Sequence, residues 1–192
     1  MKAGAVTAIV LIMILGALAG IGLIIQDRLN AHELPTYGKA PSFTLVDMHG
    51  DTYSSGKLAG TPYVINFFFS HCQAACPTTN GAMARIARDT AVEAAHFISV
   101  SVDPERDTPE VLQTYADKFK PNSRQWSFLT GTKQEVDRML VEFKLGTSTD
   151  IAEHTSRLVL VDKNQIVRGY YQGTDDEATE TLQRDLQGLL TR

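Results

Sequence analysis

The chain has 192 residues, of which 43% are hydrophobic and 21% charged, so it is neither a disordered tail nor a small disulfide-stapled peptide. Its formal net charge is -4 and its isoelectric point about 5.7, which excludes the basic surface of a nucleic-acid-binding protein. The length fits one globular domain with an appendage.

The appendage is the N-terminal segment. Residues 3–26 carry no charged side chain and follow Lys2. At about 1.5 Å per residue such a helix is long enough for a bilayer core of about 30 Å. We therefore predict a single transmembrane anchor over residues 1–26, and the positive charge at its start predicts that the chain after residue 30 is exported.

A cleaved signal peptide is the alternative interpretation of this segment. Ala17-Leu18-Ala19 matches the A-x-A cleavage pattern, although the apolar run continues to Ile25, which is long for a signal peptide. The segment lacks the Arg-rich amphipathic pattern of a mitochondrial presequence, which argues against mitochondrial import. The expected location is thus a bacterial inner membrane, with the domain in the periplasm. Residues 27–41 are polar, contain Pro35 and Pro41, and are expected to form a tether.

Residues 42–192 have the pattern of one α/β domain. Strand-like segments alternate with helical ones, which predicts a central sheet flanked by helices, with an N-terminal β-hairpin. No G-x-G-x-x-G or P-loop pattern follows a predicted strand, so phosphate and dinucleotide binding have no support in the sequence. The expected strands are residues 43–47, 63–69, 97–102, 126–129, 157–161 and 166–171, and the expected helices are 77–95, 109–119, 132–144 and 175–190.

Cys72 and Cys76 are the only cysteines, spaced C-x-x-x-C between the predicted strand 63–69 and the helix after it. A structural disulfide closing so short a loop would contribute only about 2 kcal/mol, and a domain of this size can bury its own core. A helix N-terminus stabilises a thiolate, which favours a reactive or metal-binding role for the pair over a structural disulfide. Two kinds remain open: exchange with a substrate disulfide, or binding of a soft metal such as Cu(I) or Zn with a third ligand.

The third ligand of a metal site would come from one of five histidines. His32 in the tether and His49 in a turn are expected to be solvated, and His96 precedes a buried strand, where an edge position is expected. His71 adjoins Cys72 and is either an ordinary loop residue or a group that tunes the Cys72 pKa. His154 stands just before the strand 157–161, whose edge can face the cysteine helix.

Together these motifs make the chain similar to the Sco/SenC family, named for synthesis of cytochrome c oxidase. The resemblance covers residues 40–190. C-x-x-x-C alone is weak evidence, but it occurs here with a second motif and a downstream histidine. The matching stretches are FFFSHCQAACP at 67–77, SVSVDPERDTPE at 99–110, WSFLTG at 126–131, and His154 ahead of a strand.

The resemblance implies a thioredoxin-like fold that binds one copper ion, Cu(I) or Cu(II), through Cys72, Cys76 and His154. It also implies a role in maturing the binuclear copper site of cytochrome c oxidase subunit II, by donating copper, by reducing the cysteines of that site, or both. An upstream copper donor or thiol reductant would then be a further partner. Family members often carry Pro and an acidic residue after the first cysteine, whereas this chain has Gln73 and Ala74, so its redox potential and docking are expected to differ. Asp103 matches an acidic position near the family's metal site, where it would support the metal ligands without binding the metal itself, although an Asp-Pro turn is the plainer account.

The leading hypothesis is therefore a membrane-tethered copper chaperone. The main alternative is a periplasmic thiol–disulfide oxidoreductase without copper, for which Cys72 and Cys76 would be the redox pair. Peroxide reduction is disfavoured because Phe69, Ser70 and His71 precede Cys72, where peroxidatic sites usually place Pro and Thr. A tethered binding module without chemistry predicts that both cysteines are dispensable.

Overall fold

The computed structural model describes residues 13, 16, 33–120, 125–146 and 156–191. The chain divides into two compact units, with the boundary between Glu33 and Leu34. The predicted anchor falls almost wholly outside the described residues, and so does His154. Within the described part of the chain, no helix has both the length and the apolar character needed to span a bilayer.

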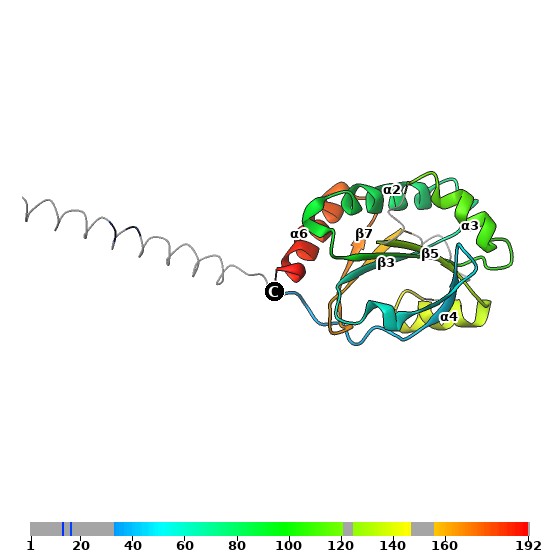
Figure 1. Cartoon of the computed structure of the whole chain (residues 1–192), viewed down its shortest axis with the longest axis horizontal. Coiled ribbons are helices and arrows are strands. Elements are labelled where there is room, and N and C mark those ends of the chain that lie inside the picture. The colour runs from blue at the N-terminus through cyan, green and yellow to red at the C-terminus, as the bar shows by residue number, and fades with distance from the viewer. Residues whose placement is uncertain (1–12, 14–15, 17–32, 121–124, 147–155, 192) are drawn as a thin grey trace, which may run out of the picture. The chain divides into compact units, whose positions relative to one another are not determined.

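The second unit is built on one seven-stranded mixed sheet (Figure 1). Its strand order is β2-β1-β5-β4-β3-β6-β7. The central strands β3, β4 and β5 are parallel, whereas β1 and β6 flank them antiparallel. The strands are β1 (Thr44–Asp47), β2 (Thr52–Ser54), β3 (Tyr63–Phe68), β4 (His96–Ser101), β5 (Trp126–Thr130), β6 (Arg157–Val161) and β7 (Val167–Gln172).

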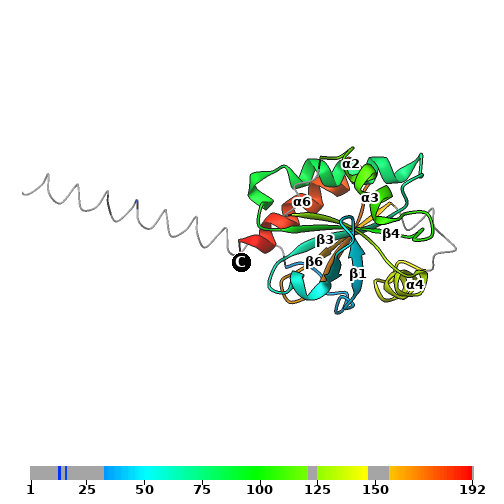
Figure 2. The same ribbon diagram turned by 45° about the vertical axis from the view of Figure 1, so that its right-hand side comes forward.

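Helices cover both faces of this sheet (Figures 1 and 2). α2 and α6 lie on one face with α3 beside them, and α4 lies on the other. The predicted mixed α/β fold and its N-terminal hairpin of β1 and β2 are confirmed. The described helices are α2 (Ala75–Ala87), α3 (Pro109–Ala116), α4 (Lys133–Glu142) and α6 (Asp176–Leu190), with short 3-10 turns η1 (Ser55–Leu58) and η2 (Thr90–Val92).

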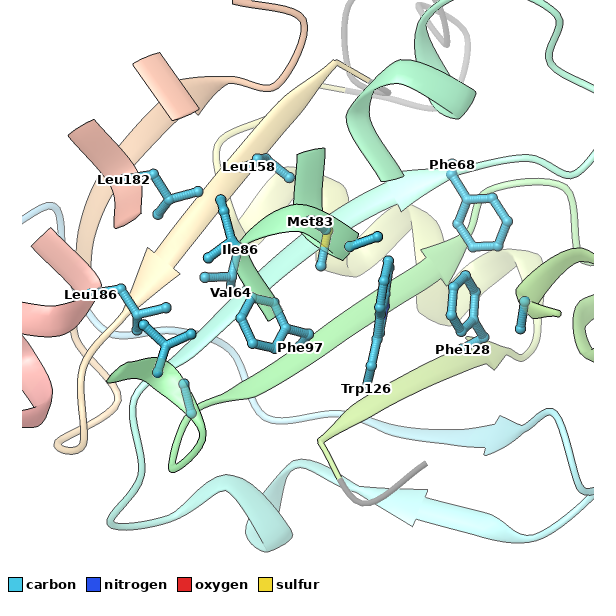
Figure 3. Packing of buried hydrophobic residues seen from close by; sticks show 14 of the residues in the cluster. Val64, Phe68, Met83, Ile86, Phe97, Trp126, Phe128, Leu158, Leu182 and Leu186 are labelled. Carbon is cyan, nitrogen blue, oxygen red and sulfur yellow. The ribbon is translucent and has the colours of Figure 1, made fainter. Parts of the chain in front are cut away.

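The alternation of side chains along β3 separates two hydrophobic cores. Val64 and Phe68 pack beneath α2 and α6, whereas Ile65 and Phe67 pack beneath α4. All six residues of β3 are buried, as expected of a strand covered on both faces. Figure 3 shows the first core, in which Met83 and Ile86 of α2 meet Val64 and Phe97 of the sheet, with Leu182 and Leu186 of α6 alongside.

The start of α3 agrees with its prediction, whereas the extent of α2 does not. Thr108 caps α3 by accepting a hydrogen bond from Val111 N, and Pro109 is the first helical residue. The predicted helix 77–95 is wrong in extent, because α2 begins at Ala75 and ends at Ala87. Asp89 then accepts a hydrogen bond from Ala91 N and starts the separate turn η2.

Part of the predicted tether is attached to the domain. Tyr37 N donates to Val167 O and Val167 N donates to Gly38 O, both at 2.9 Å. The Arg168 guanidinium donates to Leu34 O at 2.7 Å, and Leu34 is itself buried. Residues 34–40 therefore lie along the β7 edge of the domain. This part of the expected tether, residues 27–41, is not a free linker.

Candidate metal centre

The two cysteines lie where the chain leaves β3 and enters α2. Cys76 is in the first turn of α2 and fully buried, whereas Cys72 is half-buried in the loop before it. The structure has no disulfide bond between these two residues. The predicted strand-to-helix position of the pair is thus confirmed.

The sulfur of Cys72 acts as the cap of α2. The N-cap residue Ala74 has no side chain that could accept a hydrogen bond, and the first turn contains no acidic residue. Cys76 N instead donates to Cys72 Sγ at 3.5 Å. A sulfur held against the unpaired N–H groups of a helix start is well placed to carry negative charge.

The pKa of the Cys72 thiol reflects this position. Burial alone would raise it, but hydrogen bonds from the Cys76 thiol and from the N–H groups of Cys76, Ala74 and Ala75 outweigh burial. The net pKa of Cys72 is lowered. Cys72 is the more accessible sulfur of the pair, and its lowered pKa favours the thiolate that a metal ligand or an attacking sulfur requires.

A buried polar network beneath α2 connects this helix to the sheet. Asn80, one turn after Cys76, accepts from Asn66 Nδ2 at 2.9 Å and donates to the Tyr115 hydroxyl at 3.1 Å. Ser99 donates to Asn66 Oδ1 at 2.7 Å and accepts from the Trp126 indole N–H at 3.0 Å. Satisfied networks of this kind specify one packing arrangement, so α2 has a fixed register over β3 and β4. Sequence analysis missed these residues; polar residues inside buried strand patterns are the signal that points to them.

His71 and Asp103 form a surface cluster beside the cysteine loop. His71 Nε2 lies 3.5 Å from Asp103 Oδ2, and Arg106 Nη1 lies 3.0 Å from the same oxygen. The groups that lower the pKa of Cys72 are Cys76 and the helix start, not His71. Among the described residues, no three His, Cys, Asp or Glu side chains gather closely enough to hold a metal ion.

The other described histidines lie apart from the cysteines by their place in the fold. His49 is exposed in the β1–β2 turn, as expected. His96 is the first residue of β4 and half-buried, and burial lowers its pKa. Since β3 and β4 are parallel and Tyr63 pairs with His96, this histidine is at the opposite edge of the sheet from the end of β3.

The start of β6 returns to the cysteine edge of the sheet. β6 is antiparallel to β3, so its first residues lie beside the end of β3, with Leu158 opposite Asn66. Ser156 O accepts a hydrogen bond from Gly173 N at 2.6 Å. Gly173 in turn lies against α2. A Cβ added at Gly173 would be only 2.6 Å from the methyl carbon of Thr79 in that helix. Thr79 is one turn after Cys76, so Ser156, the residue before β6, lies close to the first turns of α2.

Comparisons with known proteins agree with this arrangement. The SCO1/SenC family model matches residues 32–191. The chain belongs to the SCO1/SenC family. It is 30% identical over 181 residues to a SCO2-like protein of Rickettsia prowazekii, covering 80% of this chain and 84% of the relative.

Two further relatives bear on the chemistry of the family. A Stutzerimonas stutzeri protein named as copper-binding is 28% identical over 154 residues, covering 75% of this chain and 74% of that protein. The solved structure of BsSco, a Sco-family cytochrome c oxidase assembly protein with a disulfide switch, has a TM-score of 0.72 and 25% identity. It covers 83% of this chain and 96% of the BsSco chain. The mixed α/β fold seen here therefore matches that of a solved Sco protein.

Proposed function

We propose that this chain is a copper chaperone that acts in the assembly of cytochrome c oxidase. The observation that carries the proposal is the placement of Cys72 and Cys76 together at the start of α2, on the sheet edge to which β6 returns. Family membership and the copper-binding relative support the same metal. Thiolate ligands select Cu(I), and a mixed thiolate and imidazole set also holds Cu(II).

We propose His154 as the third ligand. It precedes Ser156 by two residues, a chain length of at most roughly 7 Å. Ser156 is itself tied through Gly173 to the face of α2 one turn after Cys76. His71 also lies at the cysteine edge, but its Nε2 faces Asp103 and Arg106. Among the histidines distant from Cys72 in the sequence, His154 is the one that stands just before β6, the strand that returns to this edge.

The different burial of the two sulfurs suggests how copper leaves the site. Cys76 is enclosed, whereas Cys72 is accessible. An acceptor ligand would therefore reach copper from the Cys72 side and displace that thiolate first. A three-ligand site permits such exchange, in contrast to the closed four-ligand sites of structural zinc.

The acceptor in this proposal is the binuclear copper site of oxidase subunit II. The uncharged residues 3–26 would hold the domain to the bacterial inner membrane, and the domain would face the periplasm, where that site is assembled. A copper donor or thiol reductant acting upstream would reload the chaperone.

A second function for the same cysteines is reduction of a disulfide in the acceptor. Cys76 N donates to Cys72 Sγ at 3.5 Å, and the Cys76 thiol also forms a hydrogen bond with Cys72, so the two sulfurs are neighbours that could join in an intramolecular disulfide. In that reaction two thiols give two electrons and two protons to the acceptor disulfide, which leaves a Cys72–Cys76 disulfide and two acceptor thiols. Copper binding requires the reduced pair, so the two activities exclude each other at any moment.

The test is a Cu(I) titration of the reduced full-length chain in detergent, against a competing chelator. We expect one copper per chain, and a large loss of affinity in Cys72→Ser, Cys76→Ser and His154→Ala. His49→Ala, which removes an exposed imidazole, is the matched control and should bind as the parent does. Binding that is unchanged in Cys72→Ser would refute the chaperone proposal, and a peptide-disulfide assay would then measure the reductase function by itself.

A further inference from the structure

Asp107 is a buried carboxylate whose role the metal centre alone does not explain. Its side chain is completely shielded from solvent. Its oxygens accept three hydrogen bonds: Ser70 N at 3.0 Å, Ser70 Oγ at 2.5 Å and Ser101 Oγ at 2.5 Å. A buried carboxylate is stable only when its oxygens are paired in this way.

These donors belong to the two segments that meet at the cysteine edge. Ser70 leaves β3 two residues before Cys72, and Ser101 is the last residue of β4. Phe68 is paired with Ser101 in the parallel ladder, so the two strands end side by side. Asp107 approaches from the loop before α3 and binds both ends.

The contact to Ser70 is transmitted along a short stretch of chain. Cys72 N donates to Phe69 O at 3.2 Å, which closes a turn around Ser70 and His71. The position of the Cys72 sulfur relative to the N–H groups of α2 therefore depends on where this turn is held. Asp107 holds it through both a backbone and a side-chain donor of Ser70.

We propose that Asp107 is a positioning residue for Cys72. Its carboxylate fixes the turn before the cysteine, so that the sulfur lies against the start of α2 with the geometry that copper binding needs. This inference deepens the proposed function, because it assumes that Cys72 is a copper ligand. The predicted effect of Asp107 on the reactivity of the Cys72 thiol does not depend on copper.

The chemistry of the site explains why a carboxylate is needed. Three donors converge on two oxygens, and every one of them is an N–H or O–H group. An amide in place of the carboxylate offers one oxygen, and its NH2 group would require a serine hydroxyl to turn from donor to acceptor. Asp107→Asn therefore changes the hydrogen bonding with little change in volume.

The experiment compares Asp107→Asn with Asp162→Asn in the full-length chain. Asp162 is also buried, and its Oδ1 accepts from Asn164 N and Ile166 N in the β6–β7 turn, far along the chain from the cysteines. The readouts are the iodoacetamide alkylation rate of Cys72 at pH 7, followed by mass spectrometry, and the affinity for Cu(I). Near-ultraviolet circular dichroism confirms that each variant is folded.

We expect Asp107→Asn to slow alkylation of Cys72 by about two- to fivefold, because the sulfur loses part of its stabilisation by the helix start. Copper affinity should fall by about 10-fold or more, as when the partner of a metal ligand is removed. Asp162→Asn should change neither quantity. A folded Asp107→Asn chain whose alkylation rate and copper affinity equal those of the parent would overturn the proposal and leave Asp107 as a structural residue only.

Ser70→Ala provides the second variant if Asp107→Asn does not fold. It removes one of the three hydrogen bonds and keeps the backbone donor. A smaller decrease in both quantities is expected, and no decrease in either would overturn the proposal. If the parent chain itself binds no copper, the proposed function fails, and the alkylation rates still decide whether Asp107 positions Cys72.

Discussion

The two faces of the sheet differ in what lies beneath their helices. On the face covered by α2, the core contains the hydrogen-bonded residues Asn66, Asn80 and Ser99. On the opposite face, α4 buries the apolar side chains of Val136, Met139 and Leu140. Apolar contacts tolerate small sliding movements, whereas hydrogen bonds fix direction and register. The face that carries the cysteines is thus the one whose helix is held in one position.

The largest expected effects come from a matched pair of core truncations. Met83 of α2 and Met139 of α4 are both fully buried, one on each face. Met83→Ala and Met139→Ala should each lower the free energy of unfolding by about 2–5 kcal/mol, measured by urea denaturation. Only Met83→Ala should change the alkylation rate of Cys72 in the folded chain, and equal changes in both variants would argue against a difference between the faces.

Removal of the central amide of the polar network should have the next largest effect. Asn80→Ala leaves the Asn66 amide and the Tyr115 hydroxyl without their partner, at a cost of about 1–3 kcal/mol in the free energy of unfolding. Asn164→Ala, which truncates an exposed asparagine in the β6–β7 turn, is the control and should cost little. If the two variants were equally stable, the network would not be holding α2.

The thiol of Cys72 should remain ionised at a lower pH than an ordinary cysteine. Its pKa in the folded chain lies below that of the unfolded chain, so the thiolate adds stability above the unfolded pKa, and this contribution is lost as the pH falls through the folded pKa. The midpoint of the alkylation rate against pH should rise when the chain is unfolded in urea. A midpoint that does not move would contradict the role of the α2 start.

His96, at the far edge of the sheet, should give the smallest effect. Burial lowers its pKa, so the unfolded chain takes up the proton first as the pH falls below about 6.5. The melting temperature should therefore decline from pH 7 to pH 5, and this decline should be slightly smaller in His96→Gln. The Cys72 alkylation rate should be the same in both chains, because the two sites are at opposite edges.

Local patterns in the sequence predicted most of the elements. The strand predicted at 157–161 has the same bounds as β6, and the Thr108-Pro109 pair marks the start of α3. The end of α2 was not predictable, because Asp89 there is held by Gln183 and Gln187 from α6, more than 90 residues away in the chain.

The candidate site was predictable only where it depends on local features of the sequence. The cysteine spacing and its place before a helix are local features. The three donors on Asp107 come from residues up to 37 positions away, and only the parallel register of β3 and β4 brings them together. The place of His154 remains a prediction, since it lies outside the described residues.

The central claim is that two sulfurs and one imidazole bind a single copper ion. X-ray absorption spectroscopy of the Cu(I)-loaded, reduced full-length chain measures this directly. The account predicts two sulfur ligands and one nitrogen ligand in the parent, and loss of the nitrogen signal in His154→Ala with both sulfurs retained. A nitrogen ligand that persists in His154→Ala, or a copper ion bound by only one sulfur in the parent, would contradict it.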